Sequence, residues 1–237
     1  MVLPTRGFRG FIPRPMPLDR FSMLKESQNI CREDGLADRR WFIRLAVGAL
    51  ATILARTSRA QPAEHVGSVE DLKGHAFAER QSVRRELGRA APLFIRDQVG
   101  TGADSRLTMR LGRNTTLKVG ERARLTIDRY LIDAGGEIVL DSGPMLLERP
   151  PRSAPIPIQI RSGFGLIAVR GTRFFAGPSN NVFGVFVERG RVTVSAGGRR
   201  VIVRSGQGTD ISHPGSPPTT PVPWREPRIR AALASVL

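Results

Sequence analysis

The feature that most constrains the fold is a period-two alternation of apolar and polar side chains, which begins near Arg106 and recurs toward the C-terminus. A strand with one face in a core and the other in water needs this alternation, whereas an amphipathic helix needs a period of 3.6. Glycine-containing segments such as 112–114, 134–136 and 196–198 separate the runs. About ten short strands, spaced roughly ten residues apart, predict an all-β fold of solenoid or roll type.

The pattern is clearest in a hairpin predicted over residues 191–204, with Gly197 and Gly198 at the turn. Two consecutive glycines supply the positive φ angles that a tight hairpin turn needs. One face of the hairpin is formed by valines alone: Val192, Val194, Val201 and Val203. The other face is expected in water and is mostly basic: Arg191, Thr193, Ile202, Arg200 and Arg204.

The remaining segments give weaker signals. The segment 66–96 shows no clear period, and its charged stretch from Arg84 to Arg89 suits a solvated helix or a loop. Residues 213–227 contain six prolines and predict a loose tail, which a short terminal helix over 228–237 would follow. We therefore expect a β domain over residues 61–212 and a proline-rich tail with a short helix over 213–237.

Residues 39–60 have the pattern of an export signal. The pair Arg39–Arg40, Phe42 and a following Arg44 resemble a twin-arginine signal peptide, which is an address and not an anchor. The apolar run 45–55 has eleven residues, too few to cross a hydrocarbon core of about 30 Å. Small residues before the cut predict cleavage after Ala60. A short internal helix and an uncleaved membrane anchor are the alternatives.

Residues 1–38 contain four prolines and no apolar period, so we expect a disordered extension or a mis-assigned start, with Met16 or Met23 as the initiator. The only cysteine, Cys31, lies in this segment. A chain cleaved after Ala60 would lack cysteine, which suits an oxidising compartment. The sequence thus predicts a periplasmic protein with no stable membrane anchor.

Charge and residue counts exclude several functions. The formal net charge is +16, and residues 61–237 keep 26 basic and 16 acidic side chains, a surplus of +10. The basic residues are dispersed, and Tyr130 and Trp224 are the only aromatic residues besides phenylalanine after the signal, so nucleic-acid binding is not expected. One cysteine and three histidines offer little for a metal centre, and we expect no metal and no cofactor.

Enzyme motifs are also missing from the sequence. It contains no GxSxG, no HExxH and no phosphate-binding glycine loop with a lysine. Asp128 with Asp133, or Glu137 with Asp141, remain possible carboxylate pairs of the kind that glycosidases use. Such pairs are common on solvated strand faces, so the sequence predicts a protein that is not an enzyme.

Four segments carry a resemblance to a known family. They are GTGADSRL at 100–107, GLIAVRGTRF at 165–174, VFVERGRVTV at 185–194 and SGQG at 205–208. Together they resemble the FecR family, the periplasmic domain of iron-dicitrate-type sensors, over roughly residues 66–212. Arg189 departs from the pattern by standing between Glu188 and Gly190, and Ser205 takes the place of an alanine. Typical members also carry a cytoplasmic anti-sigma segment and a membrane helix, for which this sequence has no room before residue 61.

The resemblance points to residues with mainly structural roles. Asp104 and Ser105 after Gly102 predict a turn that caps its own amides. Gly171 predicts a bulge or a close backbone approach, Thr172 a hydrogen bond to its own backbone, and Phe174 a core side chain. The remaining motif residue is Gly190.

Arg170 and Arg173 are the candidate contacts to a partner. The resemblance implies signalling or scaffolding through contacts with an envelope protein, such as the signalling domain of a TonB-dependent receptor. Free strand edges supply the means, because an edge can accept a partner's strand. The alternative is a module that binds peptidoglycan or lipopolysaccharide through its basic surface.

Overall fold

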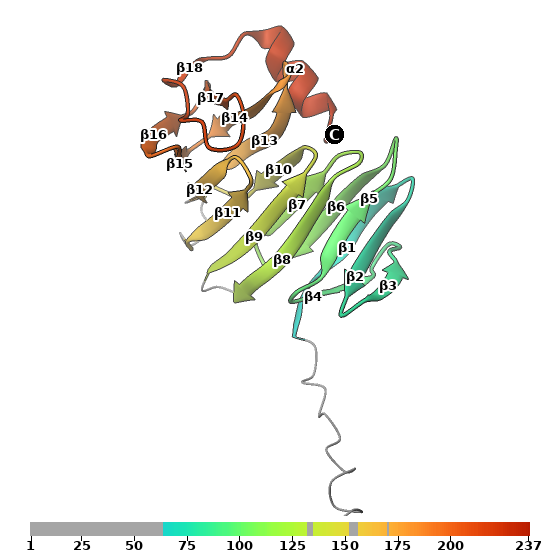
Figure 1. Ribbon diagram of the computed structural model, residues 1–237. Helices are drawn as coiled ribbons and strands as arrows, with labels where there is room; N and C mark the ends of the chain where they lie inside the picture. The colour runs from blue at the N-terminus through green and yellow to red at the C-terminus, as the bar shows by residue number, and fades with distance from the viewer. Residues whose placement is uncertain (1–63, 132–134, 152–155, 170) are drawn as a thin grey trace, which may run out of the picture. The chain divides into compact units, whose positions relative to one another are not determined.

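The computed structural model describes residues 64–131, 135–151, 156–169 and 171–237. In this part of the chain, two nine-stranded sheets pack face to face and do not close into a barrel (Figure 1). One helix, α2 (Glu226–Ala234), follows the last strand. The all-β prediction is confirmed.

We name the two sheets A and B. In spatial order, sheet A contains β18 (Val222–Pro223), β17 (Gln207–Ile211), β14 (Val182–Arg189), β13 (Arg173–Ser179), β10 (Met145–Glu148), β7 (Thr115–Val119), β6 (Arg106–Leu111), β1 (His65–Lys73) and β4 (Pro92–Phe94). Sheet B contains β16 (Arg199–Arg204), β15 (Arg191–Ala196), β12 (Gly165–Val169), β11 (Ile158–Ser162), β9 (Gly135–Ser142), β8 (Arg124–Leu131), β5 (Gln98–Thr101), β2 (Ala76–Arg80) and β3 (Val83–Glu86).

From β6 onward the chain lays successive hairpins alternately on the two sheets. β6–β7 lies in sheet A, β8–β9 in B, β13–β14 in A and β15–β16 in B. β10 crosses to sheet A by itself, and the chain then returns to pair β11 in parallel with β9. Every other pairing of these sheets is antiparallel, as the short glycine-rich connections require.

The core lies between the inner faces of the sheets, where the alternating apolar positions meet. Leu107, Met109 and Leu111 of β6 are buried in it, and their polar neighbours face outward. Phe174 is fully buried there, which confirms its predicted place in the core. In the last hairpin Val192 pairs with Val203 and Val194 with Val201, all four of them buried, as the valine pattern predicts.

Two local predictions were wrong. The stretch from Arg84 was expected to be helix or loop, but Val83–Glu86 forms strand β3, paired with β2 through a two-residue turn at Gln81 and Ser82. The sequence of β3 shows no apolar–polar alternation because none of its four side chains is buried.

The tail is also not loose. Trp224 is only 7% exposed and packs with α2 over the outer face of sheet A, which carries apolar side chains at this point. Those side chains are Leu146, Phe175 and Phe186, and they form a second core with Ala232 and Val236. The tail is thus held in place by burial of apolar area.

Candidate functional site

The edge of sheet B at β16 has unpaired backbone groups. Gly197 (φ 49°) and Gly198 (φ 74°) form the two-residue turn, so Ala196 and Arg199 are the hydrogen-bonded closing pair. Hydrogen-bonded and non-hydrogen-bonded pairs alternate along an antiparallel ladder. The backbone N–H and C=O groups of Arg200, Ile202 and Arg204 therefore point away from β15. The N–H of Arg204 indeed donates to Oε1 of Gln207, at 3.1 Å. No hydrogen bond within the described chain reaches the outward backbone groups of Arg200 and Ile202.

The same hairpin concentrates positive charge. Residues 191–204 contain four arginines and no acidic residue, so the hairpin supplies +4 of the surplus of +10. Arg191 and Arg204 are directly opposite each other, both exposed, and neither forms an ion pair with a described residue. Like charges in such a pair repel each other. Among the described residues, the Arg200 guanidinium forms one hydrogen bond, to the Ser195 hydroxyl at 3.2 Å, and no ion pair. This surface is therefore electrostatically suited to an anionic group.

Ile202 adds an apolar side chain to this basic surface. It is 45% exposed and lies between the positions of Arg200 and Arg204 on the same strand face. Arg199, at the turn, is held by the tail, because its guanidinium donates to the Pro218 carbonyl at 3.1 Å and to the Thr220 hydroxyl at 3.0 Å. The tail thus fixes one end of β16, and among the described residues it makes no hydrogen bond with the backbone of the rest of the strand.

The other sheet edges differ from β16. β18 has two residues, and β4 has three and begins with Pro92. β3 is the nearest equivalent, because its tight turn likewise directs the backbone groups of Arg84 and Glu86 outward. Its charges are mixed, however, and the Arg84 guanidinium lies over the Phe77 ring at 3.6 Å. β16 is the longest edge and the only one of these four with charges of a single sign.

The predicted partner contacts take different positions. Arg170 lies outside the described residues. Arg173 is mostly buried, with a side chain 23% exposed, and lies between two carboxylates, Glu188 at 2.8 Å and Glu148 at 3.4 Å. Its charge is thus largely compensated within the protein.

The first motif forms a turn beside the β1–β2 connection. Ser105 is fully buried, and its hydroxyl accepts the His75 N–H at 2.9 Å and donates to the Ala103 carbonyl at 2.9 Å. Asp104 has a φ of 49°, and Gly102 donates its N–H to the His75 carbonyl at 2.9 Å. The turn is as predicted, but Ser105 bonds across to the neighbouring connection instead of to its own amide. A polar hollow of about 280 Å³ beside it has balanced charges: Lys73, Arg106, Asp104 and Glu121.

The second motif lies where β12 passes into β13. Gly171 has a φ of 66°, and no atom lies within 4 Å of the position that a Cβ would take. The positive φ therefore explains this glycine, and the predicted close backbone approach does not. Thr172 is fully buried, and its hydroxyl has no hydrogen-bond partner among the described residues, which contradicts the predicted bond to its own backbone. A Cβ on Gly190 would lie 2.7 Å from the Thr172 methyl group, so Gly190 makes room for it.

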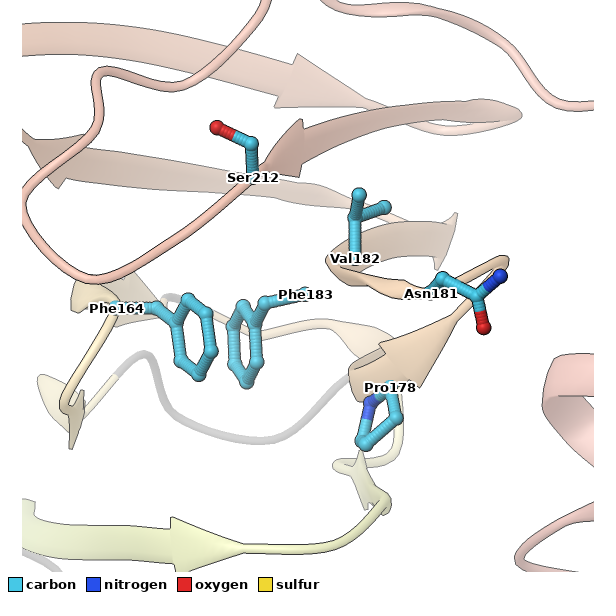
Figure 2. A pocket seen from close by; sticks show the side chains of 6 residues that line it. All are labelled: Phe164, Pro178, Asn181, Val182, Phe183 and Ser212. Atoms are coloured by element: carbon cyan, nitrogen blue, oxygen red, sulfur yellow. The ribbon is translucent and has the colours of Figure 1, made fainter.

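A pocket of about 240 Å³ opens near the β13–β14 turn (Figure 2). The rings of Phe164 and Phe183 stack along it, with centroids 4.6 Å apart and planes at 9°. Pro178, Asn181, Val182 and Ser212 complete the lining. None of these six residues is ionisable, so the pocket suits a small apolar group and offers no acid or base.

The carboxylates considered for catalysis do not form a pair in the described chain. Glu137 is nearly buried and forms ion pairs with Arg161 and, at 3.4 Å, with Arg129. Asp141 is exposed on the same strand, and Asp133 lies outside the described residues. Both described contacts of the Glu137 carboxylate are thus ion pairs with arginines and not contacts with a second carboxylate.

Other sequence predictions fall outside the described residues, including Arg39, Arg40, Phe42 and Ala60 of the export signal. Among the residues that the structure describes, no helix is long and apolar enough to cross a membrane. The same residues contain no group of three or more His, Cys, Asp or Glu side chains placed to hold a metal ion.

The β16 edge was not recognised as a site from the sequence, although its residues were assigned to the solvent-facing side of a hairpin. The available signal was a run of 14 residues, 191–204, with four arginines and no acid in a chain whose charges are otherwise interleaved. That β16 ends its sheet depends on the strand order, which the sequence did not specify.

Comparisons with known proteins give one family match. Residues 97–193, which run from the loop before β5 into β15, match the model of the family described as FecR protein. This is a regulatory family and not an enzyme family. The match confirms the FecR resemblance for the middle of the fold and ends within the β15–β16 hairpin. No curated protein matches the chain.

Solved structures give a distant likeness. Two crystal structures of a protein from Parabacteroides distasonis ATCC 8503, described as a candidate anti-sigma factor, each align with a TM-score of 0.48 and 10% identity. The alignments cover 57% of this chain and 64% and 63% of the other chains. This chain therefore spans less than two thirds of those structures.

Proposed function

We propose that this is a non-enzymatic FecR-like protein of the periplasm that acts in envelope signalling or scaffolding by binding another envelope protein. The FecR match over residues 97–193 carries the proposal, because the family is regulatory. The twin-arginine-like segment at Arg39 and Arg40 supports export. A TonB-dependent receptor or another signalling protein of the envelope is the partner that the FecR resemblance implies.

The free backbone groups at β16 support protein contacts. An edge with outward N–H and C=O groups can bind another chain by hydrogen bonds that depend little on side-chain identity. Arg173 is a weaker candidate for the contact, because two carboxylates already surround it. The arginines of the β15–β16 hairpin form no ion pair with any carboxylate in the described ranges.

The test is capture of partners from the periplasm. The full chain with a C-terminal tag is recovered from periplasmic extract, without cross-linking, at low and at high salt. We expect a specific envelope protein that remains bound at high salt, because backbone pairing and apolar burial are little screened by ions. Salt-labile recovery of peptidoglycan or lipopolysaccharide without a protein would favour the polymer-binding alternative. Absence of the protein from the periplasmic fraction would contradict the proposal.

A further inference from the structure

The β16 edge has the features of a site that accepts a strand. It combines unpaired backbone groups at Arg200 and Ile202, an exposed isoleucine, and arginines without acidic partners on the outer face. We propose that β16 binds an extended segment of a partner protein as an added strand of sheet B, and that this segment carries two acidic side chains four residues apart. The inference rests on the proposed function, since it specifies how a protein partner would be held.

The register of β16 fixes the pattern of the bound segment. Arg200 and Ile202 each offer one N–H and one C=O, so two residues of the segment can form paired hydrogen bonds with them. Side chains opposite Arg200 and Arg204 would lie on the outer face, four residues apart, and acidic groups there would face the unpaired guanidinium groups. The side chain between them would contact Ile202.

The intervening side chains of the segment face inward. They would lie beside Val201 and Val203, which are 8% and 0% exposed, so they are expected to be small and apolar. The favoured pattern is therefore acidic, apolar, neutral, apolar, acidic. Pairing of backbone groups distinguishes this mode from simple attraction of an anionic polymer, which needs only the arginines.

A fluorescent, end-blocked peptide with the core Glu-Val-Thr-Val-Glu tests the proposal on the full-length protein. Two matched peptides separate the contributions: Glu-Val-Pro-Val-Glu keeps the charge but disrupts strand pairing, and Gln-Val-Thr-Val-Gln keeps the pairing but lacks the charge. We expect the first peptide to bind best and each control to bind about tenfold more weakly. Amide hydrogen exchange should slow at Arg200 and Ile202 when the first peptide is added.

Protein variants locate the edge. Ile202→Pro removes an outward N–H and should weaken binding about tenfold, because proline at a free edge blocks the pairing but leaves the pairing with β15 intact. Glu86→Pro is the matched control on the β3 edge, and it should leave binding unchanged. Arg204→Gln should weaken binding of the acidic peptide but not of the Gln-Val-Thr-Val-Gln peptide. The thermal midpoint of each variant checks that it is folded.

Several outcomes would overturn the proposal. Equal binding of the proline-containing peptide would show attraction by charge alone, as for an anionic polymer. Loss of binding in Glu86→Pro but not in Ile202→Pro would assign the site to the other edge. If no peptide binds while the full chain still captures an envelope protein that resists high salt, this inference fails and the proposed function stands. If the peptide binds as expected but cells yield no partner, the proposed function fails instead.

Discussion

Arg85 of β3 binds the fully buried carboxylate of Asp97 at two points, with nitrogen–oxygen distances of 2.5 and 3.1 Å. Asp97 also accepts the N–H of Phe94 at 2.8 Å, so its carboxylate joins the ends of both sheets. The Arg85 side chain remains 30% exposed. Loss of Arg85 would therefore leave a fully buried carboxylate without its counterion, whereas loss of the Asp97 carboxylate would leave a guanidinium that still reaches water.

Replacing Arg85 should be severe, because it leaves a buried charge with no counterion. We expect Arg85→Met to lower the free energy of unfolding by about 3 kcal/mol, measured by urea denaturation. Adding Asp97→Asn should recover part of the lost free energy of unfolding, since a neutral amide needs no counterion. Asp128→Ala, at an exposed position, is the control and should change stability by less than about 0.5 kcal/mol. Strictly additive effects of the two substitutions would contradict this account.

Gly171 tests the need for a positive φ. With φ at 66° and open space around the Cβ position, Gly171→Val should cost about 1–3 kcal/mol through backbone strain alone. Gly163→Ala is the matched control, because Gly163 also has open space and does not have a positive φ of this kind. Thermal unfolding of the two variants compares them, and an unchanged midpoint for Gly171→Val would remove the argument.

Thr172 gives a prediction of the opposite sign. Its buried hydroxyl has no partner in the part of the chain that the structure describes, so Thr172→Val removes a polar group that is costly to bury and keeps the shape of the side chain. We expect unchanged or higher stability, by up to about 1 kcal/mol, in urea denaturation. A loss of more than about 1 kcal/mol would mean that the hydroxyl forms a bond that stabilises the fold.

Gly208 tests the packing of the tail. A Cβ at this position would lie 2.1 Å from Nε1 of Trp224, too close for the indole to remain in place. Gly208→Ala should therefore expose the indole and shift its emission to the red. Trp41 and Trp224 are the only tryptophans in the sequence, so the measurement is made in a Trp41→Phe background. Gly163→Ala, where a Cβ meets nothing within 4 Å and φ is not positive, is the control, and equal spectra would contradict the packing described.

The export prediction is tested in cells. Replacing both Arg39 and Arg40 with lysine keeps the charge but alters the pair that the twin-arginine system reads. We expect the precursor to accumulate in the cytoplasm and the shorter periplasmic form to disappear, as followed by fractionation and blotting. Normal processing of the variant would refute the twin-arginine assignment.

Prediction from the sequence worked best where local pattern determines structure. The valines of residues 191–204 and the Gly197–Gly198 turn predicted a hairpin that the structure contains, because a period of two and a tight turn are local properties. Strand β3 escaped detection because none of its four side chains is buried, so it has no apolar face to mark it. The position of Trp224 was missed because its site is formed by Leu146, Phe175 and Phe186, which are distant in the sequence.

The candidate site shows the same limit. That Arg200 and Arg204 face water was predictable, but the free backbone groups beside them follow from strand order, which is a long-range property. Arg173 was predicted as a partner contact, but its two carboxylates, Glu188 and Glu148, come from the neighbouring strands β14 and β10. Which arginines are left uncompensated thus depends on the complete fold.

The alternating placement of hairpins on sheets A and B has a consequence for how the protein folds and for whether its fragments are stable. Each hairpin shows one apolar side, and the hairpin that covers it comes next along the chain, on the opposite layer. A single hairpin does not bury enough apolar area to be stable by itself. Each hairpin packs on one that is near it in sequence, so folding can proceed through local contacts. A cut or deletion in the middle of the molecule would leave uncovered valine and leucine surfaces on both remaining pieces, and such fragments should aggregate and not survive as smaller domains.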